Sequence, residues 1–133
     1  MTTELVMLDR ATPPRGYADA RIGNGRVLHV AGQVGWKDGV FAAKDLVGQF
    51  AQTLENILEV LKAAHAHVDD IAAMTIYVTD MPAYRAARKQ LGPIWRAHFG
   101  THFPAMALVA VTELVEPEAL VEIQCIAHLE HAP

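Results

Sequence analysis

The sequence predicts an α+β domain in which two helices pack on one face of a mixed β-sheet. Residues 45–64 and 81–99 show apolar side chains at helical spacing. Residues 71–79 and 120–130 are rich in β-branched residues or alternate between apolar and polar side chains, which is typical of strands. Because these elements alternate along a chain of only 133 residues, we expect a single domain over residues 1–133.

Composition excludes several classes of protein. Apolar residues make up 52% of the chain and charged residues 20%, which is too apolar for a disordered chain. The net charge of −4 comes without a visible cluster of Lys and Arg, so we expect no nucleic-acid partner. The single cysteine cannot form an internal disulfide, and no apolar run approaches the roughly 20 residues of a membrane helix. We therefore expect a cytoplasmic protein without a membrane segment.

The first third of the chain is expected to form strands and turns. Residues 4–8 are a candidate strand, and residues 12–16 contain the Pro and Gly residues of a loop. Residues 17–22 and 26–34 follow as two further strands, separated by Gly23-Asn24-Gly25. Because this tripeptide tolerates positive φ angles, we predict a β-hairpin between the two flanking segments.

Residues 45–64 form the clearest helix. Asp45 is a suitable N-cap, because its carboxylate can accept hydrogen bonds from the first backbone N–H groups. The helical pattern ends at Ala64, which places His65 at the position where a positive φ angle is common. The apolar stripe of this helix consists of Leu46, Phe50, Leu54, Ile57, Leu58 and Leu61.

A second helix is expected over residues 81–99, with Asp80 as its N-cap and Pro82 in the first turn, where proline is tolerated. Gly92-Pro93 falls inside this segment. Because Pro93 removes one hydrogen bond and crowds the preceding turn, we expect a kink or a break here. The apolar stripe of the first half then need not continue into the second half.

Residues 106–115 and 120–130 are expected to complete the sheet. The core face of the second strand consists of Val121, Ile123, Cys125, Ala127 and Leu129. Glu122 falls on the opposite face, which is partly apolar and carries no helix, so a partner subunit is its natural cover. A carboxylate there is either a structural group at an interface or a proton-transfer group in a cleft.

The other candidate groups have structural explanations. His98 and His102 are four residues apart, like a metal-binding pair on a helix, but Gly100 between them is expected to end the helix. No further ligand falls at a suitable spacing, so we expect no metal site. Cys125 is expected to be a small buried apolar residue rather than a reactive thiol.

Several short motifs are spread over about residues 15–129. They are Gly16-Tyr17, residues 30–34, 45–49, 52–57, 68–71 and 75–81, Phe103-Pro104-Ala105, and Val121-Glu122-Ile123. Together they resemble the Rid family of reactive intermediate deaminases, which are also called YjgF-like proteins.

This resemblance implies an α+β, chorismate-mutase-like subunit that assembles as a homotrimer, with the three sheets facing a central barrel-like core. It also implies a cleft between neighbouring subunits that binds a small carboxylate. Active members of the family hydrolyse enamines and imines to a 2-oxo acid and ammonia. They use neither a metal nor an organic cofactor.

The resemblance also points to site residues. Tyr17 and Glu122 match the family's cleft tyrosine and the glutamate that positions or activates water, so they are the candidate catalytic residues. Gly32 matches the glycine whose backbone approaches the ligand, and Ala31 replaces the usual serine before it. Arg88 falls where active members carry an asparagine, so it is either a relocated carboxylate clamp or a solvated or salt-bridged helix charge.

The chain departs from the family where the substrate carboxylate is bound. Active members carry Pro-Ala-Arg, but this chain has Pro104-Ala105-Met106, and methionine supplies neither the charge nor the two donors of a guanidinium. Leu108 stands in place of a frequent cysteine on the same strand face, so this part of the substrate site is more apolar. Three functions stay open: an imine or enamine deaminase of altered specificity, a non-catalytic small-molecule-binding or regulatory trimer, and a ribonuclease. The acidic composition argues against the ribonuclease.

Overall fold

The computed structural model of the chain describes residues 2–11 and 17–130. In this part of the chain the elements, in order, are β1 (Thr3–Val6), β2 (Ala20–Gly23), β3 (Arg26–Val34), α1 (Leu46–Ala63), the short 3₁₀ helix η1 (Val68–Asp70), β4 (Ile71–Val78), α2 (Met81–Phe99), β5 (Ala105–Ala110) and β6 (Val121–Leu129). None of these helices is long and apolar enough to span a membrane.

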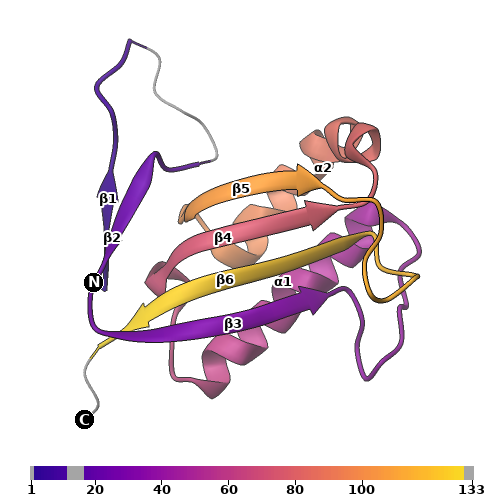
Figure 1. Cartoon of the computed structure of the whole chain (residues 1–133), viewed down its shortest axis with the longest axis horizontal. Helices are drawn as coiled ribbons and strands as arrows, with labels where there is room; N and C mark the ends of the chain where they lie inside the picture. Colours follow the sequence, from indigo (N-terminus) through magenta and orange to yellow (C-terminus); the bar gives the residue numbers. More distant parts are fainter. Residues whose placement is uncertain (1, 12–16, 131–133) are drawn as a thin grey trace.

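A four-stranded mixed sheet forms the centre of the domain. Its strand order is β3-β6-β4-β5, with β4 and β5 parallel and the other two pairs antiparallel. Both helices lie behind this sheet in the view of Figure 1. The predicted α+β fold is therefore confirmed. We call the side that packs on the helices the helix face and the other side the open face.

The predicted hairpin between residues 17–22 and 26–34 is wrong. β2 pairs with β1, and β3 pairs with β6, so the two segments belong to different sheets. Gly25 redirects the chain between them with a φ of 94°, and a Cβ there would lie 1.9 Å from the Leu129 carbonyl oxygen. The close passage along the end of β6, and not a two-strand turn, is why glycine is needed at this position.

The β1–β2 pair is attached to the body of the domain by side-chain hydrogen bonds. Thr3 Oγ1 donates to the Asp69 carbonyl oxygen at 2.9 Å, and Thr2 donates to the Asp70 carboxylate. Arg21 Nε donates to the Phe103 carbonyl oxygen, also at 2.9 Å. These bonds hold the β1–β2 pair against the loops that precede β4 and β5, and Figure 1 shows its far end projecting from the body.

Helix α1 begins and ends as its sequence predicts. The Asp45 carboxylate accepts a hydrogen bond from the Gly48 N–H, which confirms the N-cap. His65 follows the C-cap Ala64 with a φ of 56°, so the predicted positive φ is confirmed. Apart from Leu58, which is partly buried, the predicted apolar stripe is buried against the sheet.

Helix α2 is one helix through Pro93, so of the two expected outcomes, a kink or a break, the break is wrong. Its buried residues, Leu91, Trp95 and Phe99, form one stripe on both sides of the proline. Pro93 lies on the exposed side, where water can hydrate the carbonyl that has lost its partner. Burial of the apolar stripe then outweighs the loss of one hydrogen bond. The Asp80 N-cap is confirmed by its bond from the Ala83 N–H at 3.0 Å.

The last two strands differ in how well the sequence predicted them. β5 ends at Ala110, earlier than the expected residue 115, because its partner β4 ends at Val78. β6 follows the predicted alternation, with four residues of its expected core face fully or almost fully buried: Val121, Ile123, Cys125 and Ala127. The open face of β6 therefore carries Glu122, Gln124, Ile126 and His128.

Candidate functional site

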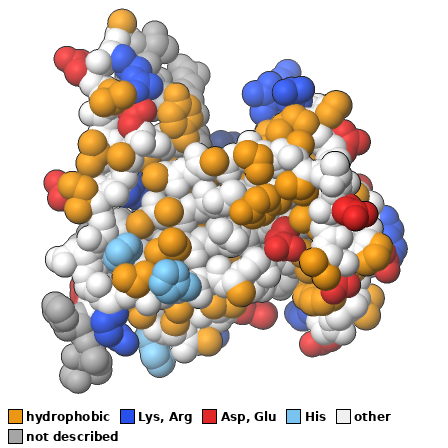
Figure 2. Space-filling model, in the orientation of Figure 1, with side chains coloured by type: hydrophobic (Ala, Val, Ile, Leu, Met, Phe, Trp, Pro, Cys, Tyr) orange, Lys and Arg blue, Asp and Glu red, His pale blue; other side chains and the backbone are white. Residues whose placement is uncertain are grey.

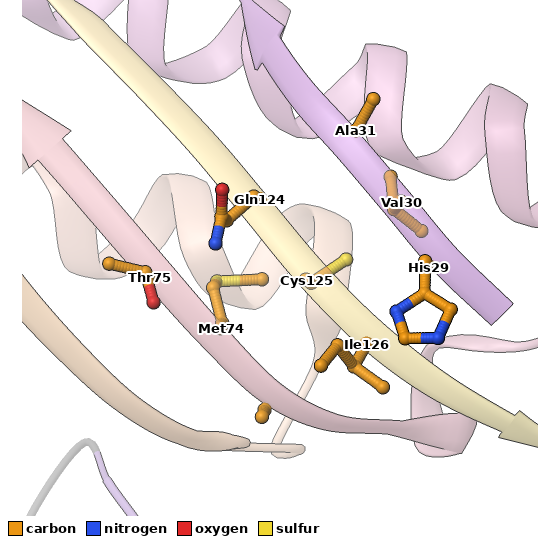
Figure 3. Close-up of a pocket in the computed structure, with 9 residues that line it drawn as sticks. His29, Val30, Ala31, Met74, Thr75, Gln124, Cys125 and Ile126 are labelled. Carbon is orange, nitrogen blue, oxygen red and sulfur yellow. The ribbon is translucent and has the colours of Figure 1, made fainter. Parts of the chain in front are cut away.

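The open face of the sheet holds a shallow cavity of ≈ 350 Å³ between β3, β6 and β4. Figure 3 shows three polar side chains around it, the His29 imidazole, the Thr75 hydroxyl and the Gln124 amide, each from a different strand. Ala31, a predicted site residue, lies at its upper edge in that view. The cavity thus combines polar groups with an apolar floor, which is the usual composition of a small-molecule site.

Sequence reasoning did not single out His29, Thr75 or Gln124. The strand alternation could have pointed to Gln124, because this residue lies two positions after Glu122 and therefore on the same face of the strand. Thr75 pairs with Gln124 across β4 and β6. The pairing of these strands, which the sequence did not show, is what brings the two side chains together.

Glu122 and Gly32 lie against each other beside this cavity. A Cβ on Gly32 would lie 2.3 Å from Glu122 Oε2, so only glycine leaves room for the carboxylate in this position. The pairing register shifts between Val30 and Gln33, and this irregularity leaves both Ala31 and Gly32 exposed. Among the residues that the structure describes, no hydrogen bond or ion pair engages the Glu122 carboxylate. This half-buried carboxylate is available to a ligand.

Met106 and Leu108 lie on the other side of the sheet. They pair with Met74 and Ile76 of β4, which are buried on the helix face, and both pack against the apolar core. The two residues share a strand face, as the spacing predicted. Within one chain, however, the sheet separates them from Glu122.

Arg88 belongs to the helix side as well. It is exposed on α2, and in the described part of the chain no carboxylate pairs with it. Its charge acts on the neighbouring Tyr84: burial raises the pKa of the Tyr84 hydroxyl, and the Arg88 charge opposes that rise. Arg88 is therefore on the same side of the sheet as Met106, and not on the side of Glu122.

Tyr17 stands at the beginning of the described segment that leads into β2. Its side chain is 45% exposed, and no hydrogen bond is formed between it and the Glu122 carboxylate. Residues 12–16, the expected loop before it, lie outside the described residues. Within the described chain, Tyr17 is thus partly open to solvent and is not hydrogen-bonded to the other candidate catalytic residue.

The two histidines with metal-like spacing have separate structural partners. His98 Nδ1 donates to the Ile94 carbonyl oxygen, and His102 Nε2 donates to the Ile71 carbonyl oxygen, both at 2.8 Å. Over residues 2–11 and 17–130, no three His, Cys, Asp or Glu side chains gather as they would around a metal ion. Cys125 is buried, and burial raises the pKa of its thiol to about 12, so the predicted inert cysteine is confirmed.

These features define a class of protein: a small α+β chain with one sheet face that its helices leave uncovered and with candidate ligand groups divided between the two sides of the sheet. The sequence profile of the family described as Endoribonuclease L-PSP matches residues 7–129. The chain therefore belongs to this family, which includes the proteins named Rid and YjgF, as its motifs predicted.

Individual relatives resemble this chain in sequence, and two solved structures also resemble it in fold. The RutC family protein PH0854 of Pyrococcus horikoshii is 31% identical over 129 residues, which covers 96% of this chain and 98% of that protein. The Rid family protein YyfB of Yersinia pestis, described as of unknown function, is 33% identical with a TM-score of 0.85, covering 97% of this chain and all of that one. Rv2704 of Mycobacterium tuberculosis, a member of the YjgF/YER057c/UK114 family, is 31% identical with a TM-score of 0.65, covering 86% of this chain and 88% of that one.

Proposed function

We propose that this chain forms a homotrimer in which each small-molecule site lies between two neighbouring subunits. One observation carries the proposal: Gly32 and Glu122 are on the open face, whereas Met106 and Leu108 are on the helix face, near the β5 edge. No single ligand can contact both groups within one chain. In a closed ring the β5 edge of one subunit can approach the open face of the next, and the two halves then meet.

The open face also has the surface of an interface. Three large apolar side chains on it, Val27, Val109 and Ile126, are each more than a third exposed. Figure 2, which looks onto this face, shows hydrophobic and His side chains spread across it, with an acidic side chain among them in the right half and other acidic groups at the margins. Burial of such a face against two further copies removes apolar area from water and supplies the cover that the helices do not provide.

The chemistry that fits this cleft is hydrolysis of an imine or enamine to a carbonyl compound and ammonia. An enamine first tautomerises to its imine. The Glu122 carboxylate then takes a proton from a water molecule as the water oxygen attacks the carbon of the C=N bond, and it returns that proton to the nitrogen. The C–N bond of the resulting carbinolamine breaks, which gives the carbonyl compound and ammonia. Tyr17 reaches the cleft from the segment before β2. Met106 and Leu108 line the other half with apolar surface, so the preferred substrate is less polar than a 2-imino acid.

Two measurements test this function. Light scattering is expected to give about three times the chain mass of 14.5 kDa, and a stable monomer at micromolar concentration would contradict the shared site. Ammonia release is then followed from imines generated in place from several amino acids and amines. We expect turnover of apolar imines, and Glu122→Gln abolishes it without dissociating the trimer. A trimer that binds an imine analogue but releases no ammonia from any substrate would make the protein a non-catalytic binder.

A further inference from the structure

The exposed side of helix α2 is strongly cationic. Between Met81 and Phe99 the helix contains Arg85, Arg88, Lys89 and Arg96 but no Asp or Glu. The whole chain carries 15 acidic and 11 basic residues, so this helix departs from the charge of the rest of the protein. Figure 2 shows a group of Lys and Arg side chains projecting at the upper right, over α2.

Three of these cations form a continuous row. Arg85, Lys89 and Arg96 are all exposed, and their spacing of four and seven residues places them along one line of the helix. Gly92 falls between Lys89 and Arg96, and a Cβ there would lie 3.6 Å from Arg96 Nη1. The Arg96 guanidinium therefore lies back over Gly92 and closes the gap. We call these three residues the α2 cationic row, which extends over about 16 Å.

No acidic side chain forms an ion pair with this row among the residues that the structure describes. The ion pairs there involve Arg10, Lys44, His98 and His102, and none involves the row. Like charges one helical turn apart destabilise a helix, so the row carries a cost in the free chain. An anionic partner would remove that cost.

The row also stays accessible when the open face is covered. It lies on the exposed side of α2, away from the buried stripe of Leu91, Trp95 and Phe99 that packs toward the sheet. The open face is on the other side of the sheet from α2, so covering that face does not by itself cover the row. The inference below therefore does not depend on the proposed function.

We propose that the α2 cationic row is a docking site for a short acidic segment of another protein, a stretch of Asp and Glu side chains long enough to face all three cations. Charge complementarity selects the anion, and the bidentate guanidinium groups of Arg85 and Arg96 fit carboxylates. The shortness of the row favours a short segment, because a long polyanion would continue over a surface with excess negative charge.

The neighbours of the row favour a protein over RNA or a membrane. The other exposed residues of α2 are Pro82, Ala86, Arg88, Gln90, Pro93 and Ala97. None of them is aromatic, so this face lacks the stacking platforms of single-strand binders. None is a large apolar residue either, so α2 has no surface to insert into a bilayer.

A labelled peptide of about eight Glu residues, which is long enough to span the row, tests the proposal by fluorescence anisotropy at physiological ionic strength. The same peptide with Gln in place of Glu is the control ligand. We expect the Glu peptide to bind, and the triple variant Arg85→Gln, Lys89→Gln, Arg96→Gln to weaken binding at least about tenfold. The triple variant Lys37→Gln, Lys44→Gln, Lys62→Gln makes the same change in net charge elsewhere, and we expect an effect of less than about twofold.

Each of the following results of the binding experiment would overturn the proposal. Absence of binding to the full chain, or equal weakening by both triple variants, would mean that the row is not a specific site. Tighter binding of an oligouridylate of equal charge through the same row would assign it to RNA, and tighter binding of phosphatidylserine vesicles would assign it to membranes. Glutamine is a good helix former, so circular dichroism and the melting temperature verify that both variants remain folded.

Discussion

Replacing Gly32 with alanine tests whether the position of the Glu122 carboxylate matters for the chemistry. The new methyl group would lie 2.3 Å from Glu122 Oε2, 2.9 Å from Cδ and 3.1 Å from Cγ. Ordinary van der Waals contact begins at 3.4 Å, so the carboxylate has to retreat by about 1 Å. The backbone at position 32 has no positive φ, and alanine is therefore strained by this contact alone.

The expected effect is large on turnover and small on stability. The atoms that clash belong to the far end of a flexible, half-buried side chain, so a change of rotamer absorbs the clash at a cost of about 1 kcal/mol. A displacement of about 1 Å of a positioned group costs on the order of 100-fold in rate. We expect Gly32→Ala to lower kcat for ammonia release about 100-fold, while the melting temperature falls by no more than about 5 °C.

Gly92→Ala is the matched control. The added methyl group meets only Arg96 Nη1 at 3.6 Å, and alanine stabilises a helix interior by roughly 0.5–1 kcal/mol relative to glycine. This variant should melt at the same or a higher temperature and keep the wild-type turnover. If Gly32→Ala retains full turnover with an unchanged KM, the carboxylate at position 122 does not act on the substrate and the proposed chemistry is wrong.

Three further predictions concern separate parts of the chain. His65→Gly should be neutral or stabilise the fold by up to about 1 kcal/mol, because the φ of 56° is strained for histidine; a clear loss of stability in urea unfolding would refute this. Burial holds the pKa of His102 below its ordinary value of about 6.5, so the unfolded chain binds the proton first and stability falls as the pH drops below that value. His102→Gln should flatten this dependence, and an unchanged slope would assign it to other groups. Met106→Arg should raise turnover of 2-imino acids at least about tenfold, since a charge-assisted contact is worth roughly 1.5–3 kcal/mol. If the wild type already hydrolyses them and Arg88→Ala has no effect, a positive clamp is not required.

The local elements of this fold were predictable because their signals are local. The caps of α1 and α2, Asp45 and Asp80, and the positive φ of His65 follow from hydrogen bonds within a few residues of the helix ends. The alternation along β6 placed Glu122 away from the helices, because a shift of one residue would bury its carboxylate in the apolar core. The family followed from motifs spread over the whole chain.

Two wrong predictions, the hairpin and the helix break, both concern places where contacts distant in sequence decide the structure. Gly23-Asn24-Gly25 has the composition of a hairpin turn, but β3 finds its partner in β6, about a hundred residues away, and Gly25 serves that passage instead. Pro93 has the composition of a helix break, but the stripe of Leu91, Trp95 and Phe99 keeps α2 whole. In both cases tertiary packing outweighed a local preference.

The sequence by itself determined both long helices with their caps, the approximate positions of the strands, the α+β class, the family and the identity of the candidate groups, because each of these depends on residue type and near-neighbour spacing. Only the tertiary structure decided which groups share a surface. The strand order β3-β6-β4-β5 brings Gly32 to Glu122 and places Thr75 beside Gln124, and it leaves Met106 and Leu108 on the opposite side. Strand order is selected by the total apolar area that the whole chain buries, and no short stretch of sequence contains that information.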